Sequence, residues 1–540
     1  MKKHLLLFFA LIYCVAGIAQ FSKEENQLAL NLVKANSKAL GLSEKDMGNL
    51  LVSSTYQTTT DRIRMVYLQQ TFKGIPVHNQ MQVLAFKNSR LVSASGGRIE
   101  NLEQLVNNAA AVPKVIARDA VIAAIRNRDL PVPVVITALQ QKGGKTVFGK
   151  LGIALNDVTA ELVWLAVNSK DIRLAWEIEL VPQKSADHWM IRVDATSNEV
   201  LDKNNLTVYE HLPESVNNNL ITAASRNGND DVNVSTGNIP NSPLVVNAAT
   251  YRVIPYPAES PVHTGGTAAL ITDPWNLSSG NAVSLKWHFD GITYHDSTRG
   301  NNVWAQEDRD NNDNTFGRTA ISTTAQPTLN FDFVPNFTLA PTVTVNQQLA
   351  TTNLFYWNNL VHDISYLYGF DEPSGNFQAS NQGRGGAGND YVIADAQDAG
   401  GTNNANFSTP VDGTRPRMQM YLFTGTTPNR DGDLDNGIVI HEYGHGISNR
   451  LTGGPANSSC LSNAEQGGEG WSDYYTLMLT TNWATAQVTD GAFGRAVGTY
   501  ALGQAPNGAG IRTYPYSTNM SVNPWTYASM AGSGGAVHVI

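Results

Sequence analysis

The sequence contains only two cysteines, and this scarcity limits how the protein can be stabilised. Cys14 lies within an apolar N-terminal stretch, so Cys460 is the only cysteine left if that stretch is removed. An intrachain disulfide is then excluded. An exported protein without disulfides has to gain its stability from packing or from bound ions, which makes calcium a candidate ligand.

Basic residues and long apolar runs are also few. The chain has 37 Lys and Arg against 46 Asp and Glu, a formal net charge of -9, and no basic run that would follow a phosphate backbone. We therefore expect no nucleic-acid partner. Beyond the N-terminus no apolar run approaches the length of a membrane span, so we expect no membrane-spanning segment there. A chain of 540 residues favours several domains.

Residues 1–19 have the three parts of a secretory signal. Two lysines precede an apolar stretch from Leu5 to about Val15, and small residues follow before Gln20. The stretch is too short, and has the wrong flanks, to remain as a membrane span. The sequence therefore predicts a secreted, extracellular protein.

The region after this signal alternates helical and strand patterns that fit two small α+β units. Ser22 and Glu25 form a capping box before an apolar helical pattern that Gly41 would end, and a second helix is predicted from Pro113 to about Ile125. Alternating apolar residues predict strands, the first of them in an antiparallel meander. The strand-like segments are Met65–Gln70, Met81–Phe86, 161–167, 173–180 and 188–201.

A change of composition marks the main domain boundary. From Pro213 to Ala248 there is no aromatic residue, and asparagine, serine and glycine dominate, so this segment is predicted to be an exposed linker that proteases can cut. Aromatic residues return after Ala249. We predict a multidomain α+β protein: a signal peptide (1–19), two small α+β units (20–110 and 111–212), the linker (213–248) and a final domain (249–540).

The segment "HEYGHGISNR", residues 441–450, places two histidines four residues apart. On a helix, His441 and His445 lie one turn apart on the same face and can converge on one metal ion. Glu442 lies about 100° around the helix, near the metal but badly placed to bind it. Zinc with three protein ligands leaves a position for water, and a neighbouring carboxylate can act as general base. The alternative is an ordinary helix surface.

A third ligand is predicted downstream, in "EQGGEGWSDYYTLML". Glu469 and Asp473 are four residues apart at the start of an apolar helical pattern, so their carboxylates point the same way. One can bind the metal while the other accepts a hydrogen bond from a ligating histidine. The alternative is a solvated acidic first turn that complements the helix dipole. Glu465 is a competing ligand that ranks below Glu469.

The run "HEYGHGISNRLTGGPANSSCL" followed by "GEGWSD" resembles the fungalysin family of secreted zinc metalloendopeptidases, relatives of thermolysin. Segments upstream, "TNLFYWNNLVHDISYLYGFDEPSGNFQ" and "NNANFSTPVDGTRPRMQMYLF", are similar to that family too. Residues 45–100 resemble the propeptide shared by fungalysins and thermolysins, and the second α+β unit is interpreted as PepSY-like. The resemblance implies a thermolysin-like catalytic domain with a β-rich first part. It also implies roles for five residues: His441, His445 and Glu469 as zinc ligands, Glu442 as the base, and Asp473 as the partner of a ligating histidine, His441.

Other roles rest on the same resemblance. His538, in "GSGGAVHVI", matches the histidine that donates a hydrogen bond to the oxyanion in this clan, and Asn404 and Ala405 lie in a segment similar to the edge strand that pairs with the substrate backbone. The alternative for the latter pair is a polar loop. In the thermolysin branch a tyrosine also lies between the second zinc-binding histidine and the glutamate ligand. No tyrosine lies between His445 and Glu469 here. Tyr514 and Tyr516 can approach the site from another loop, or they can serve in packing.

Two departures from the family pattern affect these expectations. Position 444 is glycine where fungalysins commonly have threonine, which costs the helix about 1 kcal/mol relative to alanine. The chain stops two residues after His538, where the family continues with a helical segment. We therefore expect a fragment whose helical part is truncated and whose C-terminal histidine frays.

These features predict a secreted, latent zinc endopeptidase that acts on proteins or peptides. Residues 20 to about 248 would form a propeptide that assists folding and blocks the cleft until the linker is cut. The alternatives are a zinc- or peptide-binding protein without peptidase activity, and a zinc hydrolase acting on another bond. Calcium is a further candidate ligand at the acidic runs from Asp308 and from Asp431, although solvated loops are the default interpretation of both.

Overall fold

The structure is a computed structural model that describes residues 22–58, 61–142, 144–210, 245–313, 317–463 and 466–530. The predicted signal peptide, most of the predicted linker, Glu465 and His538 lie outside these residues. Helices and mixed sheets are both present, which confirms the α+β class. No helix in the described ranges is both long and apolar enough to cross a membrane.

The first helix begins at the predicted capping box but is shorter than predicted. In α1 (Lys23–Ala35), the Ser22 hydroxyl accepts from the Glu25 backbone N–H, and the Glu25 carboxylate accepts from the Ser22 N–H. The helix ends at Ala35, six residues before Gly41, because the Asn36 side chain donates to the Leu32 carbonyl and also accepts from the backbone N–H of Leu91 on a neighbouring strand. Tertiary contacts thus set the end of this helix.

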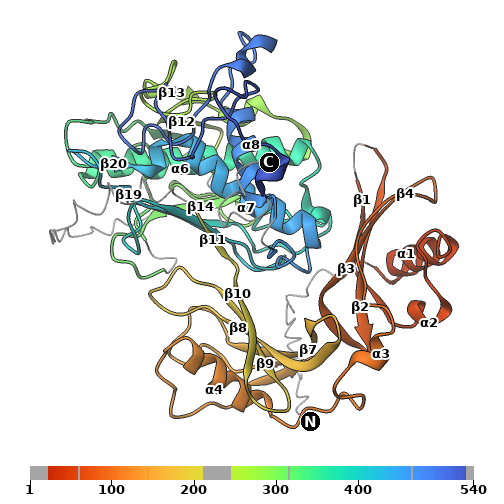
Figure 1. Cartoon of the computed structure of the whole chain (residues 1–540). Coiled ribbons are helices and arrows are strands. Elements are labelled where there is room, and N and C mark those ends of the chain that lie inside the picture. The colour runs from red at the N-terminus through yellow and green to blue at the C-terminus, as the bar shows by residue number, and fades with distance from the viewer. Residues whose placement is uncertain are drawn as a thin grey trace, which may run out of the picture.

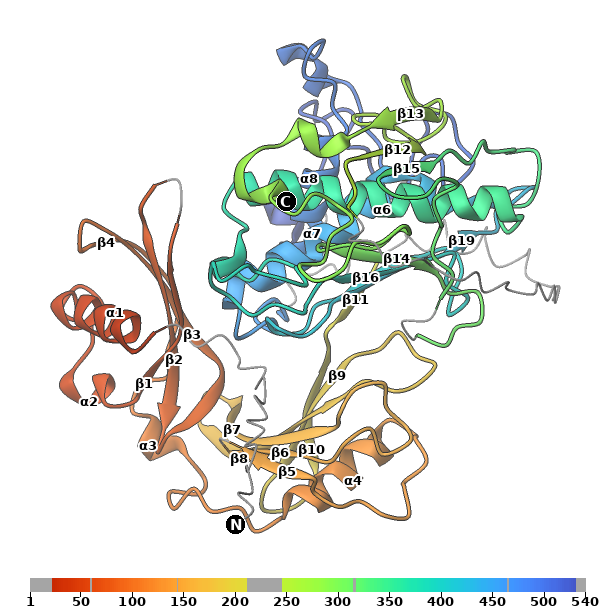
Figure 2. The ribbon, with the colours of Figure 1, turned by 180° about the vertical axis from the view of Figure 1, so that it is seen from behind.

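An antiparallel meander follows α1, as predicted, and packs against it. Leu32 of the helix and Val66 and Leu84 of the sheet belong to one small buried core. Figures 1 and 2 show α1 and α2 together on one side of this sheet. The elements are α2 (Glu44–Met47), β1 (Leu50–Gln57), β2 (Arg64–Phe72), β3 (Ile75–Lys87) and β4 (Arg90–Gly96).

A second meander continues the same sheet, joined to the first by one parallel pair between Val77 and Trp164. Its helix, α4 (Ala117–Asn127), begins four residues later than predicted from Pro113, because the backbone N–H groups of Lys114 and Val115 donate to the Ala195 carbonyl. The other elements are α3 (Leu102–Leu105), β5 (Gln140–Lys142), β6 (Lys145–Val147), β7 (Thr159–Asn168), β8 (Asp171–Leu180), β9 (Trp189–Asp194) and β10 (Val200–Asn205).

The C-terminal region contains a five-stranded mixed sheet, and one of its edge strands comes from the N-terminal region. The strand order is β11-β17-β18-β16-β14, so β11 (Thr207–Tyr209) covers the edge of β17 (Ala405–Ser408). The segment 417–423 forms two strands that are separated at Tyr421. The remaining strands are β12 (Ala248–Val253), β13 (Ala269–Thr272), β14 (Val303–Glu307), β15 (Thr328–Phe331), β16 (Val392–Ala396), β18 (Arg417–Met420), β19 (Leu422–Phe423) and β20 (Arg430–Asp431).

Three helices form the centre of the C-terminal region. In the two overall views, α6 and α7 lie together above the five-stranded sheet, with α8 beside α7 (Figures 1 and 2). One large apolar core surrounds them. Their bounds are α6 (Thr344–Leu367), α7 (Asn436–Gly453) and α8 (Gly468–Leu479); short 3-10 turns are η2 (Pro274–Leu277), η3 (Gly280–Val283), η4 (Glu372–Ser374), η5 (Gly432–Leu434), η6 (Val488–Ala492) and η7 (Tyr527–Met530).

Candidate metal centre

Helix α7 carries both histidines of the predicted metal site and is buried on nearly every side. His441 and Glu442 are fully buried, and His445 is 2% exposed. The interpretation of this segment as a helix surface is therefore wrong. A polar motif held inside a core needs partners for its polar atoms, and these partners come from other elements.

Close packing of α7 against α8 depends on Gly444. A Cβ at this position would lie 2.7 Å from the Ser472 Oγ and 3.0 Å from the Ser472 Cα on α8. The glycine that departs from the family pattern is thus a packing contact between the two helices. Because α8 also carries Glu469, this contact sets the separation of the predicted ligands.

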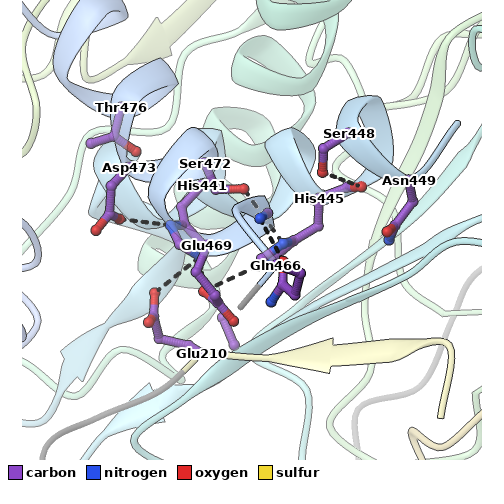
Figure 3. A network of polar contacts seen from close by, with 12 residues as sticks. Glu210, His441, His445, Ser448, Asn449, Gln466, Glu469, Ser472, Asp473 and Thr476 are labelled. Carbon is purple, nitrogen blue, oxygen red and sulfur yellow. Dashed lines mark hydrogen bonds and ion pairs between the residues drawn. The ribbon is translucent and has the colours of Figure 1, made fainter. Parts of the chain in front are cut away.

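The three predicted ligands come together in the structure. The Glu469 Oε2 lies 3.1 Å from the His441 Nε2 and 3.6 Å from the His445 Nε2, and Glu469 is fully buried. One ligand atom from each residue lies within 4.8 Å of the other two. Figure 3 shows the three side chains pointing toward one another from α7 and α8. The interpretation of Glu469 as part of a solvated first turn is wrong.

Asp473 contacts the far nitrogen of the first histidine. Its Oδ1 lies 2.7 Å from the His441 Nδ1, while the Arg512 guanidinium donates to both carboxylate oxygens at 2.6 Å and the Tyr516 hydroxyl donates to Oδ2. Burial acts to raise the pKa of Asp473, but the charge of Arg512 and the contact with His441 hold that pKa well below its usual range. An ionised carboxylate at this nitrogen orients the imidazole and directs Nε2 toward the ligand cluster.

Glu442 is a buried carboxylate whose hydrogen bonds are not made within the described chain. Neither of its side-chain oxygens has a hydrogen-bond partner among the described residues. Burial raises the pKa of Glu442 well above its usual range, and the nearby carboxylates of Glu210 and Glu469 add to this effect. A buried polar group without a partner is costly unless water or a ligand satisfies it. Glu442 is therefore suited to hold a water molecule beside the ligand cluster.

The donor set fits zinc. Two imidazole nitrogens and one carboxylate are the usual ligands of a catalytic zinc with an open position. Tetrahedral zinc with bonds of about 2.0–2.1 Å places its ligand atoms about 3.3 Å apart. The distances of 3.1 and 3.6 Å from the Glu469 Oε2 to His441 and His445 lie on either side of that value.

Comparison with known proteins identifies the family. The model described as "Fungalysin metallopeptidase (M36)" matches residues 250–540, and the "Fungalysin/Thermolysin Propeptide Motif" matches residues 49–97. Extracellular metalloproteinase 2 of Trichophyton tonsurans is 34% identical over 550 residues, which cover 96% of this chain and 76% of that protein. Extracellular metalloproteinase 2 of Arthroderma otae is 45% identical over 292 residues, 53% of this chain and 43% of that protein. The chain belongs to the fungalysin family.

Family membership confirms the class of enzyme predicted from the motifs. This fungalysin is a zinc metalloendopeptidase, and its propeptide motif indicates that it is made as a precursor. The buried cluster of His441, His445 and Glu469 is a group of residues in the described structure that could hold a metal ion.

The edge strand predicted at Asn404 and Ala405 is occupied by the fungalysin's own chain. β11 pairs antiparallel with β17, and the Glu210 backbone N–H donates to the Ala405 carbonyl at 3.0 Å. The Asn404 side chain accepts from the Ala405 N–H at 2.8 Å. Ala405 therefore lies in a strand and not in a polar loop, whereas Asn404 precedes the strand, and whether either residue pairs with a substrate stays a prediction.

Two residues at the site were not found from the sequence. Glu210 reaches the centre from β11, and Arg512 binds both Glu210 and Asp473. Neither lies in a spacing pattern with the "HEYGH" motif, so only the fold could bring them there. Of the two tyrosines considered, Tyr516 approaches Asp473, whereas Tyr514 packs edge-on against Trp525.

The aspartates of the second acidic run considered for calcium are buried, and in the first run Asp308 and Asp313 are buried while Asp310 is exposed, so the interpretation as solvated loops holds for only part of the first run. One oxygen from each of Asp308, Asp313 and Asp398 lies within 4.8 Å of the others, and these residues are at most 3% exposed. Asp431 and Asp433 instead accept hydrogen bonds from Gln397. Burial raises the pKa of Asp308 to about 7, of Asp313 to about 6 and of Asp398 to about 8. Calcium at the first group stays a prediction.

Proposed function

We propose that this fungalysin is a secreted endopeptidase in which His441, His445 and Glu469 bind the zinc and Glu442 is the general base. The convergence of these three ligand atoms inside the core, next to the two Glu442 oxygens that have no hydrogen-bond partner in the described part of the chain, supports this assignment most strongly. Zinc bound there would act as a Lewis acid that polarises the scissile carbonyl and makes the attacking water more acidic.

The residues of the chain would then handle the protons and the orientation of the site. A Glu442 carboxylate oxygen takes a proton from the attacking water and passes it to the nitrogen of the leaving amine. Asp473 holds His441 through its Nδ1 and so keeps Nε2 directed at the metal. By resemblance, His538 donates a hydrogen bond to the oxyanion.

We further propose that residues 20–212 are the propeptide, that the linker 213–248 is the region cut during activation, and that 249–540 is the catalytic domain. Support comes from the pairing of β11 with β17, since a bound segment of the chain covers the edge where an extended peptide would add as a strand. The N-terminal pattern of residues 1–19 and the names of the extracellular relatives support secretion.

Replacement of Glu442 by glutamine tests the role of the base. Glu442→Gln keeps the shape of the side chain and lies outside the ligand set, so the protein should retain one zinc while kcat on a peptide falls about 10²- to 10⁴-fold. His445→Ala is the matched variant, because it should lose the zinc itself. Zinc content by atomic emission and turnover after linker cleavage are the measurements. Undiminished turnover in Glu442→Gln would disprove the assignment.

A further inference from the structure

Strand β11 delivers a carboxylate to the metal centre. The strand pairs with β17 from Thr207 to Tyr209, and Glu210, the next residue, is the last one described before the linker. The Glu210 side chain is fully buried, although this residue belongs to the part of the chain that precedes the linker. Figure 3 shows it directed at His441, opposite Asp473.

The position of this carboxylate matches that of a ligand. The Glu210 Oε2 lies 3.7 Å from the His441 Nε2, close to the separation of about 3.3 Å expected between two ligands of tetrahedral zinc. The corresponding distance from His445 to Glu469 is 3.6 Å. Glu210, His441 and Glu442 each offer an atom within 4.8 Å of the others. Glu210 therefore lies within reach of an ion bound at His441.

Arg512 holds the carboxylate in this position. The guanidinium binds the Glu210 Oε1 through one terminal nitrogen and lies 3.2 Å from Oε2 through the other, while it also pairs with Asp473. A rigid, bidentate partner of this kind fixes the direction of a carboxylate.

The charges at the site also call for a divalent cation. The single guanidinium of Arg512 is shared by Glu210 and Asp473, and the buried carboxylate of Glu469 faces His441 and His445. Burying several carboxylates around few basic groups is costly. A divalent cation bound between Glu210 and Glu469 would offset part of this charge.

We propose that in the uncut precursor Glu210 is the fourth ligand of the zinc and that it keeps the enzyme latent by filling the coordination position that water needs. This inference rests on the proposed function. It differs from a merely structural role, in which Glu210 would form a buried ion pair with Arg512 and leave the metal's coordination unchanged. Activation would then require the carboxylate to leave together with β11.

The test compares metal release from three forms of the full-length precursor. Zinc-loaded wild type, Glu210→Gln and Tyr209→Phe are mixed with the chromogenic chelator 4-(2-pyridylazo)resorcinol, and the rate of zinc release is recorded. Loss of a ligand should speed release by at least about tenfold in Glu210→Gln. Tyr209→Phe removes a hydroxyl on the same strand that donates to Asp187 at 3.0 Å, away from the metal, and should release zinc like wild type.

Cobalt substitution separates a ligand from an ion pair. The visible absorption band of the Co²⁺-loaded precursor should change in Glu210→Gln and stay unchanged in Tyr209→Phe, because only a ligand alters the coordination of the ion. The wild-type protein provides the same test without a variant: its cobalt band should change when the linker is cut and the N-terminal segment is separated. An unchanged band in both experiments would overturn the proposal.

A further control distinguishes this inference from the proposed function. His445→Ala should abolish stoichiometric zinc binding in the precursor. If it does, and Glu210→Gln nevertheless releases zinc at the wild-type rate, the metal centre stands and the role of Glu210 is refuted. If His445→Ala keeps its zinc, the assigned metal centre is refuted together with the role of Glu210.

Discussion

The two regions of the chain bury their helices in different ways. In the N-terminal region, α4 packs one face on a sheet and buries four of its eleven residues. In the C-terminal region, α7 buries sixteen of eighteen residues, including charged ones. A helix of the first kind is stabilised mainly by apolar contact, whereas a helix of the second kind depends on partners for each buried polar group. We therefore expect the C-terminal region to respond more strongly when a polar partner is lost.

The largest expected effect is the loss of Arg450 from α7. Its guanidinium is fully buried and donates to the Pro410 and Gly375 carbonyls at 2.8 Å and to Asp390 at 3.2 Å. Arg450→Ala leaves the buried Pro410 and Gly375 carbonyls and the Asp390 carboxyl group without their donor, so the free energy of unfolding should fall by about 3–5 kcal/mol. Urea unfolding followed by circular dichroism measures this loss.

Arg192 in the N-terminal region is the matched control for Arg450. It is also fully buried, but its partners Glu177 and Asp202 are 19% and 46% exposed, so water can solvate them when the arginine is removed. Arg192→Ala should cost about 1–3 kcal/mol. Equal losses for the two variants would contradict the comparison.

The pH dependence of stability should have opposite signs in the two regions. In the C-terminal region, the raised pKa values of Asp308 and Asp398, about 7 and about 8, mean that the folded state holds protons that the unfolded state releases. Their contribution to stability is fully present below the unfolded pKa of 3.8 and is lost as pH rises toward 8. A carboxyl group whose pKa is two units higher in the folded than in the unfolded state contributes about 3 kcal/mol to the free energy of unfolding at low pH.

In the N-terminal region the sign is reversed. Burial acts to raise the pKa of Glu177, but the hydrogen bond from His78 and the charge of Arg192 lower it to about 2. This contribution is present above the unfolded pKa of 4.5 and is lost as pH falls through about 2. Calorimetry of the precursor without divalent cations should show that, as the pH rises from 5 to 8, only the unfolding transition of the C-terminal region moves to lower temperature. Calcium, predicted from the acidic run at Asp308, should restore it at pH 8.

The smallest expected effect concerns one methyl group on α7. Gly444→Ala would press a Cβ against Ser472, which costs about 1–3 kcal/mol, partly offset by about 1 kcal/mol of helix propensity. The net loss of stability should be about 1 kcal/mol, with weaker zinc binding because α8 moves with Glu469. Chelator competition and thermal unfolding measure both quantities.

A glycine in the N-terminal region offers the control. At Gly48 the backbone is right-handed helical and an added Cβ would lie 3.5 Å from its nearest neighbour. Gly48→Ala should therefore leave zinc binding unchanged and raise stability by up to about 1 kcal/mol. If Gly444→Ala were stabilising as well, the helix contact would not be tight.

Local patterns in the sequence were enough to predict much of the fold. The capping box at Ser22, the meander and the helix of the "HEYGH" motif all follow from spacings of a few residues. The prediction misplaced the last residue of α1 and the first residue of α4, because contacts with distant segments of the chain decide both positions. The merging of two units into one sheet was not predicted either, since it depends on the pairing of Val77 with Trp164.

The candidate site was predictable where its residues share one helix or two successive ones. His441, His445, Glu469 and Asp473 lie within 33 positions of the chain, and helical periodicity gives their directions. Glu210 and Arg512 are separated by 302 positions, and their meeting depends on β11 crossing to the C-terminal sheet. The burial of Asp308 and Asp313 was also missed, because a run of acidic residues normally indicates exposure to solvent.

Strand β11 has a consequence for the solubility of the enzyme under the proposed removal of the N-terminal segment. With β11 gone, β17 becomes the outermost strand of its sheet, and its free backbone groups can pair with the same strand of another molecule. β17 has only four residues, Ala405–Ser408, which limits how firmly two such edges can adhere. The segment before the linker would thus also act as a cover against self-association, protecting the newly made protein until substrates are present to take its place.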